Sequence, residues 1–298
     1  MKVLVIGNED RYRKYMPDRE IANEAEITYC PIGTSDEELI EKGKDAQILL
    51  VDAIARVSKK LIEHLPNLCL IHSEGVGYNA IDIQAAKERG IYVCNNKGMN
   101  AGAVAEQTIL LMLGVLREVV TGDRNVRDGL QIQTKEKAMV EGIIELADCK
   151  IGLIGFGDIA KETAKRLHSF DCELYYNSRT RLSKEVENKH HVTYLELDEL
   201  AAACDIISIH VPVTNVTTGM INEQFLRKMK KTAFLINTAR GEIVDNLALR
   251  EAIISGDIKG AGLDTVYPEP MEKDNPLVNL PKEVANRVLF SPHIGGIT

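Results

Sequence analysis

A glycine motif in the second half of the chain has the spacing that binds the pyrophosphate of a dinucleotide. The pattern G-x-G-x-x-A begins at Gly155, with its second glycine at Gly157. An apolar run directly precedes it and a helical pattern follows, as a strand–turn–helix unit requires. Glycines there let the backbone approach a phosphate, and Asp158 and Ile159 would present N–H groups at the start of the helix. The motif predicts a dinucleotide site.

The residues after the next strand bear on which dinucleotide binds. NAD sites usually carry an acidic residue about 20 residues past the first glycine, where it binds the ribose hydroxyl. Here the chain has no carboxylate and reads Asn177, Ser178, Arg179, Thr180 and Arg181. Two guanidinium groups and two hydroxyls could bind a 2′-phosphate by charge-assisted hydrogen bonds. The sequence favours NADP over NAD, and the alternative is that both arginines are ordinary surface charges.

The same glycine pattern occurs earlier, at Gly75, Val76 and Gly77. Three residues separate it from the preceding apolar run, and the strand that follows ends in two asparagines with no acidic residue for a ribose. A dinucleotide site is therefore not expected here. A loop of free backbone N–H groups could still hold a small anion.

Further polar residues follow apolar strands in the second half. Ligands of open parallel sheets bind beyond the carboxyl ends of the strands. Arg240, between alanine and glycine after a fully apolar strand, is expected to face that crevice. His210 also follows a strand, and we interpret it as a structural, hydrogen-bonded histidine.

The elements that position these residues alternate between strands and helices along the whole chain. This alternation is typical of α/β proteins with mostly parallel sheets, and it occurs in two series. Strands are predicted at residues 3–6, 27–30, 48–51, 68–71, 91–94, 151–154, 173–176, 205–209, 233–236 and 259–263. A helix at 101–120 is apolar nearly all round and must be buried, at a junction between the domains or at a subunit interface. Residues 122–150 are predicted to form a peripheral helix and a connector.

Composition excludes several classes of function. The chain has 298 residues, 45% apolar and 27% charged, with a net charge of −8. An acidic chain is a poor ligand for nucleic acid or for an anionic membrane surface, and no apolar run is long enough to cross a bilayer. The six cysteines form no CxxC pair, so no metal site is predicted. We expect reduced thiols in a cytoplasmic protein.

Four ordered segments resemble one family, the D-isomer-specific 2-hydroxyacid dehydrogenases. They are the glycine motif at 155–160 and the segments NTARGEIVD at 237–245, GLDTVYPEP at 262–270 and SPHIGG at 291–296. The runs 75–82 and 98–117 are similar to that family too. The resemblance implies two doubly wound domains, a flavodoxin-like substrate domain at 1–98 and a Rossmann dinucleotide-binding domain at 99–290. It further implies a segment at 291–298 that returns toward the substrate domain, and a homodimer formed through 101–120.

The resemblance also implies roles for individual residues. His293 would be the general acid/base, Glu269 the carboxylate that pairs with it, and Arg240 the guanidinium that binds the carboxylate and carbonyl oxygens of a 2-oxo acid. The backbone of residues 75–77 would hold the substrate carboxylate. Asp264 would lie near the nicotinamide amide, and Thr108 would approach the cofactor phosphates. The residues expected to line the dinucleotide are Val211, Pro212, Thr217, Thr238 and Ala239.

The implied activity is hydride transfer between a nicotinamide cofactor and a small 2-oxo or 2-hydroxy acid. The residues at 177–181 resemble those of NADP-preferring glyoxylate and hydroxypyruvate reductases. Asp52 would repel a substrate phosphate, although Arg56 could approach one, so phosphoglycerate dehydrogenase is an alternative. A second alternative is a dinucleotide-sensing, co-repressor-like binding protein without turnover. The chain ends five residues after His293, where family members usually continue through a helix that helps to close the cleft, and this gives the second alternative some weight.

Overall fold

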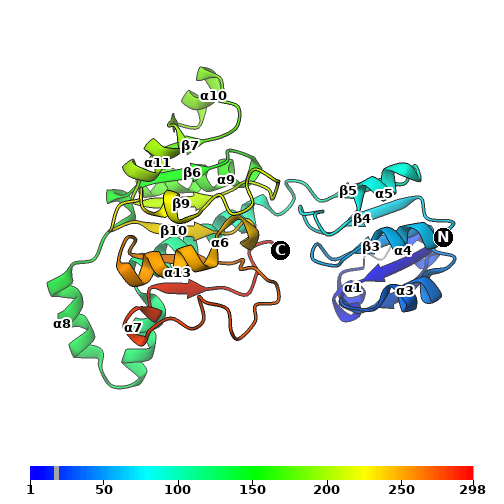
Figure 1. Ribbon diagram of the computed structural model, residues 1–298, viewed down its shortest axis with the longest axis horizontal. Helices are drawn as coiled ribbons and strands as arrows, with labels where there is room; N and C mark the ends of the chain where they lie inside the picture. Colours follow the sequence, from blue (N-terminus) through cyan, green and yellow to red (C-terminus); the bar gives the residue numbers. More distant parts are fainter. Residues whose placement is uncertain (17–19, 298) are drawn as a thin grey trace. The chain divides into compact units, whose positions relative to one another are not determined.

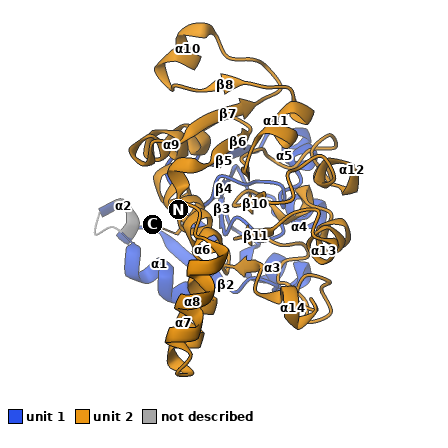
Figure 2. Ribbon diagram, turned by 90° about the vertical axis from the view of Figure 1, so that its left-hand side faces the viewer, with its two compact units in different colours: residues 1–100 blue, residues 101–298 orange. Residues whose placement is uncertain are grey.

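A computed structural model describes residues 1–16 and 20–297. The chain forms two compact units, Met1–Asn100 and Ala101–Thr298, coloured separately in Figure 2. The division lies two residues after the domain boundary that the sequence predicts at 98.

Unit 1 is built on a five-stranded parallel sheet with the order β2-β1-β3-β4-β5. The order reverses between β1 and β3, as in flavodoxin-like folds. Its strands are β1 (Lys2–Ile6), β2 (Glu26–Cys30), β3 (Ile48–Val51), β4 (Leu70–Ser73) and β5 (Tyr92–Asn95). Its helices are α1 (Glu9–Tyr15), α2 (Glu20–Asn23), α3 (Asp36–Gly43), α4 (Lys59–His64) and α5 (Ile83–Glu88).

The prediction for β4 was two residues too early. The strand includes His72 and Ser73, because pairing with β3 continues to the contact between Val51 and Ser73. The last two residues of the strand are polar, so the apolar run in the sequence stops before the strand does. The correction matters, since it places the glycine loop at residue 75 directly after the sheet rather than after a connector.

Unit 2 contains a seven-stranded parallel sheet with the order β12-β11-β10-β9-β6-β7-β8. The order reverses between β6 and β9, which is the arrangement of dinucleotide-binding domains. Its strands are β6 (Lys150–Ile154), β7 (Glu173–Asn177), β8 (Thr193–Tyr194), β9 (Ile206–Ile209), β10 (Phe234–Asn237), β11 (Gly260–Leu263) and β12 (Val288–Phe290). The two strands at the edges, β8 and β12, are only two and three residues long, and the sequence analysis did not predict them.

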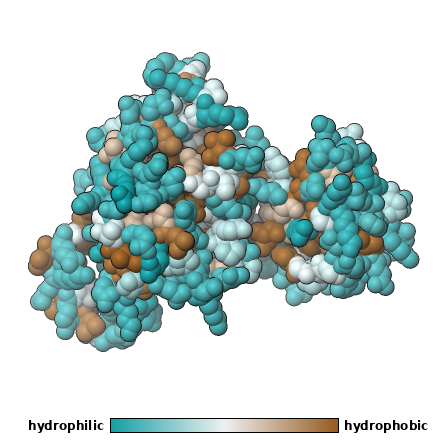
Figure 3. All heavy atoms as spheres, viewed as in Figure 1, coloured by the Kyte–Doolittle hydropathy of each residue, from teal (hydrophilic) through white to brown (hydrophobic). Residues whose placement is uncertain are grey.

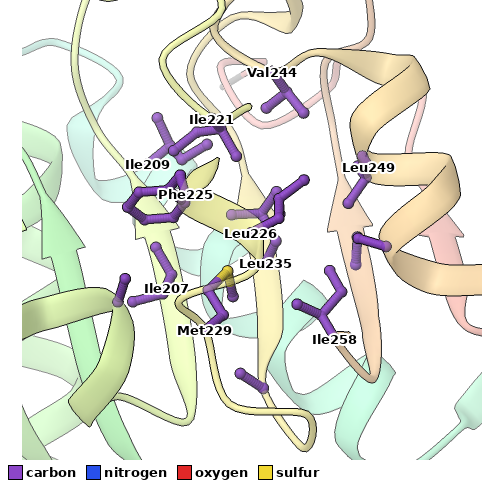
Figure 4. Close-up of a cluster of buried hydrophobic side chains, with 14 of the residues drawn as sticks. Ile207, Ile209, Ile221, Phe225, Leu226, Met229, Leu235, Val244, Leu249 and Ile258 are labelled. Atoms are coloured by element: carbon purple, nitrogen blue, oxygen red, sulfur yellow. The ribbon is translucent and has the colours of Figure 1, made fainter. Parts of the chain in front are cut away.

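Helices cover both faces of the second sheet (Figure 1). One face packs against α6 (Ala101–Leu116) and α9 (Asp158–Leu167), and the other against α11 (Leu197–Ala203), α12 (Glu223–Leu226) and α13 (Asn246–Ser255). Figure 4 shows the second of these clusters, where Phe225 and Leu226 lie among strand residues such as Ile207 and Leu235. Two apolar layers fix the sheet and therefore the loops at its carboxyl edge.

The apolar helix predicted at 101–120 is buried, as expected, and the contacts described here lie within unit 2. Helix α6 packs on α9, β10 and β11, and a Cβ atom at Gly114 would lie 2.5 Å from the side chain of Leu289. The helix ends at Leu116. It thus covers the dinucleotide-binding sheet.

Two further helices, α7 (Val119–Arg127) and α8 (Gln131–Glu141), extend away from the body of unit 2 (Figure 1). Neither contains a buried residue. The sequence predicted one peripheral helix and a connector in this stretch, and the structure has two helices. No helix in the described part of the chain combines the length and apolar character needed to cross a bilayer.

Candidate active site

The glycine motif after β6 forms a turn that only glycine accommodates well. Gly155 has a φ of +93°, and its N–H donates to the carbonyl of Asn177 at 2.7 Å. A Cβ atom at this position would lie 2.5 Å from the carbonyl oxygen of His210. The turn therefore brings the ends of β6 and β9 together at the point where the strand order reverses.

Gly157 caps the N-terminus of α9, and a Cβ atom there would meet nothing within 4 Å. The N–H groups of Asp158 and Ile159 begin the helix as predicted, where the helix dipole favours an anion. Open space beside a helix start, at the switch point of a parallel sheet, fits a dinucleotide pyrophosphate. Residues in the loops after β6, β7 and β9 would hold this cofactor.

The two arginines after β7 differ in their contacts with the rest of the chain. The Arg181 side chain pairs with Glu187 at 3.0 Å, and its guanidinium carbon lies 4.9 Å from the centre of the Tyr194 ring. Arg179 is exposed and has no ion-pair partner in residues 1–16 and 20–297. Asn177 donates to the carbonyl of Leu195, and Ser178 donates to that of Thr180. Arg179 is thus the cation that this loop leaves open to a ligand.

Glu187 was not identified by the sequence analysis, and it organises this loop. Its buried carboxylate accepts hydrogen bonds from Lys184 at 2.5 Å, from Arg181 and from the Tyr176 hydroxyl at 2.9 Å. These hydrogen bonds to Lys184 and Arg181 lower the pKa of Glu187 to about 2. The Tyr176 hydroxyl also accepts the N–H of Leu182. The only signal in the sequence was a glutamate within an exposed, polar helix pattern, which has many commoner explanations.

The loop after β10 is tied together by a fully buried amide. The Asn237 side chain accepts the N–H of Ala239 at 3.0 Å and donates to the carbonyl of Arg240 at 2.9 Å. These bonds fix the backbone from which the Arg240 side chain, partly buried, extends. The Arg240 guanidinium donates to the carbonyl of Ala239 at 2.7 Å.

Thr238 and Thr108 share a hydrogen bond between their hydroxyls at 2.9 Å. Thr108 also donates to the carbonyl of Val104, and its side chain has no exposed surface. The predicted contact of Thr108 with cofactor phosphates would require this pair to open. In the structure the pair joins α6 to the loop after β10.

The loop after β12 is held by the buried carboxylate of Asp264, which directly follows β11. Its two oxygens accept the N–H groups of Ile294 and Gly295 at 3.1 and 2.9 Å. A second anchor is the hydrogen bond from Gln107 to Ser291 at 2.7 Å. Asp264 thus holds the backbone of this loop through both carboxylate oxygens, and its predicted position near the nicotinamide amide stays a prediction.

His293 and Glu269 meet within this loop region. Nδ1 of His293 lies 2.5 Å from Oε1 of Glu269, and about a quarter and a third of the two side chains are exposed. His293 has a φ of +57°, which is uncommon for a residue other than glycine. The two backbone bonds to Asp264 hold that conformation. Because Nδ1 is occupied, Nε2 is the nitrogen available to a ligand.

Arg240 comes from a neighbouring loop of the same sheet edge. Gly241 packs so tightly on the backbone of Val266 and Tyr267 that a Cβ atom there would overlap it. The Arg240 loop therefore lies against the segment that continues to Glu269. Because β10, β11 and β12 are adjacent and parallel, all three predicted catalytic residues follow the carboxyl ends of neighbouring strands.

The loop after β9 carries the remaining predicted cofactor contacts. Thr217 donates to the carbonyl of Pro212 at 2.7 Å, and Val211 lies against the turn at Gly155. His210 lies within hydrogen-bond distance of Ser208, at 3.0 Å, and burial lowers its pKa to about 4. These features agree with a structural, neutral histidine.

Unit 1 presents the other glycine loop directly after β4. Hydrogen bonds from Asn96, Asn95 and Ser73 occupy the carbonyls of Gly75, Val76 and Gly77, respectively. The N–H groups of these three residues donate to no acceptor in the part of the chain that the structure describes. A loop with satisfied carbonyls and free N–H groups is suited to an anion.

Comparisons with known proteins agree with this geometry. The family model for "D-isomer specific 2-hydroxyacid dehydrogenase, NAD binding domain" matches residues 109–295. A glyoxylate reductase from Thermofilum pendens is 41% identical over 265 residues, covering 89% of this chain and 76% of the relative. A D-3-phosphoglycerate dehydrogenase from Archaeoglobus fulgidus is 37% identical over 267 residues, covering 89% of this chain and 48% of the relative.

A solved structure of an acyclic imino acid reductase in complex with NADPH and D-Arg aligns with a TM-score of 0.85 and 27% identity. The alignment covers 100% of this chain and 91% of that one. Sequence and fold therefore lead to one assignment: the chain belongs to the D-isomer-specific 2-hydroxyacid dehydrogenase family.

Proposed function

We propose that this chain reduces glyoxylate or hydroxypyruvate with NADPH. Hydride transfer between a nicotinamide cofactor and a small 2-hydroxy acid is the reaction class of its relatives. The observation that carries the proposal is the His293–Glu269 pair, held at the carboxyl edge of a dinucleotide-binding sheet. A histidine with one nitrogen fixed by a carboxylate is built to exchange a proton through the other.

The residues of the chain have distinct tasks in this proposal. When bound, the nicotinamide supplies or accepts the hydride. Nε2 of His293 donates a proton to the substrate oxygen during reduction and removes it during oxidation. Glu269 holds the ring in the orientation that this transfer needs. Arg240 binds the carboxylate and carbonyl oxygens of the 2-oxo acid and stabilises negative charge that develops on the carbonyl oxygen.

The glycine loop of unit 1 has a binding task in this proposal. Its three free N–H groups would bind the substrate carboxylate, which every 2-oxo acid carries.

The preference for NADPH is supported by the exposed Arg179 and by the absence of any carboxylate at 177–181. Arg181 is engaged by Glu187, so the two arginines should contribute unequally. The chain has no tryptophan, and binding can be followed by the fluorescence of the reduced cofactor itself. We expect Arg179→Ala to weaken NADPH binding by about tenfold or more and to leave NADH binding nearly unchanged. Arg181→Ala is the matched control, and equal binding of NADPH by Arg179→Ala and the parent would contradict the preference.

The activity is tested with a panel of 2-oxo acids that includes glyoxylate, hydroxypyruvate and 3-phosphohydroxypyruvate. We expect the protein to oxidise NADPH with the first two. A preference for the phosphorylated acid would identify a phosphoglycerate dehydrogenase instead. Tight cofactor binding without turnover of any acid in the panel would favour the co-repressor-like alternative.

A homodimer is also proposed. The contact predicted at 101–120 stays a prediction, and we infer that the contact surface includes α7 and α8. Apolar residues of these helices and the following loop are exposed (Figure 3), namely Val119, Val120, Val126, Ile132, Met139, Val140, Ile143 and Ile144. Exposed apolar surface of this extent on a projecting pair of helices needs cover in water. A second copy of the chain would supply the same surface in return.

We further propose a reducing, cytoplasmic location. All six cysteines are unpaired, and four of them are buried. Such thiols are typical of proteins that remain in a reducing compartment.

A further inference from the structure

The buried carboxylate of Glu187 holds two cations beside the predicted cofactor loop. Glu187 lies in helix α10 (Lys184–Lys189), and only 4% of its side chain is exposed. Its Oε1 accepts a hydrogen bond from Nε of Arg181 at 3.0 Å, and its Oε2 accepts one from Nζ of Lys184 at 2.5 Å. Both cations of this group are therefore paired with one buried negative charge.

Arg181 has further contacts besides this ion pair. Its guanidinium carbon lies 4.9 Å from the centre of the Tyr194 ring, which is a cation–π contact. The backbone of the next residue is fixed as well, because the N–H of Leu182 donates to the hydroxyl of Tyr176, which itself donates to Glu187. About half of the Arg181 side chain is still exposed. Solvent thus reaches the guanidinium, but three groups hold it and its backbone in place.

These contacts lie toward the edge of the second sheet. A 2′-phosphate would bind at the carboxyl end of β7, which is the second strand of the dinucleotide-binding unit. Tyr194 belongs to β8, the edge strand on the far side of β7 from β6 and its glycine turn. The Arg181 guanidinium is therefore drawn toward the edge of the sheet. Within the described part of the chain, Arg179 has no such contact with a carboxylate or a ring.

We propose that Glu187 limits the preference for NADPH by holding Arg181 away from the 2′-phosphate, so that NADH remains a usable cofactor. If Arg181 bound the phosphate, the buried carboxylate would keep Lys184 as its single cation, and separating a buried ion pair is unfavourable. Arg179 then supplies the main guanidinium contact. Glu187 acts through Arg181 and is a positioning residue. The inference rests on the proposed function, because it assumes that the phosphate binds in the loop after β7.

The test is a double-mutant cycle on one ratio, the dissociation constant for NADH divided by that for NADPH. Both constants are measured by the fluorescence of the reduced cofactor, and the ratio removes effects on the parts that the two cofactors share. In Glu187→Gln a neutral amide holds Arg181 less tightly, and the guanidinium can reach the phosphate. The ratio should rise by about tenfold. Arg181→Ala should remove most of this rise, whereas in the parent it should change the ratio by less than about threefold.

The matched control is Glu185→Gln, which makes the same change in charge two positions away on α10, at an exposed residue. A rise of equal size in this control would show a general effect of charge and would overturn the inference. Tyr194→Leu is a second variant, which releases Arg181 without changing the charge and should raise the ratio by about threefold. Melting temperatures show whether each variant is folded. If Glu187→Gln does not fold, an unchanged ratio in Tyr194→Leu overturns the inference.

Two results of the cycle itself would also overturn the inference. One is an equal effect of Arg181→Ala in the parent and in Glu187→Gln. The other is a lower ratio in Glu187→Gln, which would mean that Glu187 presents Arg181 to the phosphate. Arg179→Ala separates this inference from the proposed function: if NADPH binding by Arg179→Ala equals that of the parent, the proposed preference for NADPH fails first, and this inference with it.

Discussion

The loop that carries His293 depends on a carboxylate that touches its backbone rather than its side chain. Each oxygen of Asp264 accepts one N–H group, from Ile294 and Gly295. In Asp264→Asn one oxygen becomes an amide NH₂ group, which donates hydrogen bonds and cannot accept one. We expect a loss of about 1–3 kcal/mol in stability and a lower kcat, because His293 loses its fixed position. Calorimetric melting and steady-state kinetics check this, with the exposed Asp274→Asn as control. Equal melting temperatures and kcat values for the two variants would contradict the assignment.

His210 sets a pH dependence at the same scale. Its pKa is about 4 in the folded protein and about 6.5 in the unfolded chain, because burial disfavours the charged ring. The stability that it contributes is present above pH 6.5 and is lost as the pH falls through 4. The melting temperature of His210→Gln should therefore fall less between pH 7 and pH 4 than that of the parent. Parallel curves for the two proteins would show that the ring stays neutral for another reason or titrates normally.

At the scale of an element, the turn between β6 and α9 contains two glycines with different requirements. Gly155 has a positive φ and a crowded Cβ position, whereas Gly157 has an ordinary φ of −84° and open space. Gly155→Ala should therefore cost more than about 1 kcal/mol of stability. Gly157→Ala should leave the melting temperature within about a degree of the parent but weaken cofactor binding, since the methyl group occupies the approach of the pyrophosphate. Equal losses of stability in Gly155→Ala and Gly157→Ala would contradict these different requirements.

Most elements of the fold follow from local patterns, and those that were missed depend on distant partners. The strands from β1 to β3 and from β9 to β11 are short apolar runs that any parallel sheet would bury. Strand β8 contains only Thr193 and Tyr194, and its existence depends on pairing with β7. Helix α8 has no buried face, so apolar periodicity had nothing to detect.

At the scale of the whole molecule, the candidate site combines groups that are far apart in the chain. Sequence motifs identified His293, Glu269 and Arg240, because each occurs in a segment that resembles the family. They did not reveal the residues that hold them, such as Asn237, or the pairing of Glu187 with Arg181. Those residues act through hydrogen bonds across 2 to 11 positions, and the apolar pattern of the sequence does not reveal such contacts.

The exposed apolar side chains of α7 and α8 lead to a prediction about the proposed homodimer. Met139 and Val140 are 74% and 86% exposed, and an aspartate at either position would place a charge in the proposed dimer contact. We expect Met139→Asp combined with Val140→Asp to convert a dimer into a monomer, as measured by light scattering after gel filtration. Val216→Asp is the control, since Val216 is also 86% exposed but lies in the loop after β9. A parent protein that is already monomeric would contradict the proposed dimer.

The central claim is that His293, oriented by Glu269, transfers the proton during reduction of a 2-oxo acid. The direct measurement is NADPH oxidation with glyoxylate by the parent and by His293→Ala, together with cofactor titration of both proteins. The account predicts that kcat falls by about 10²–10⁴-fold in the variant, while the dissociation constant for NADPH stays within about twofold of the parent. Turnover by His293→Ala at the rate of the parent would contradict the account.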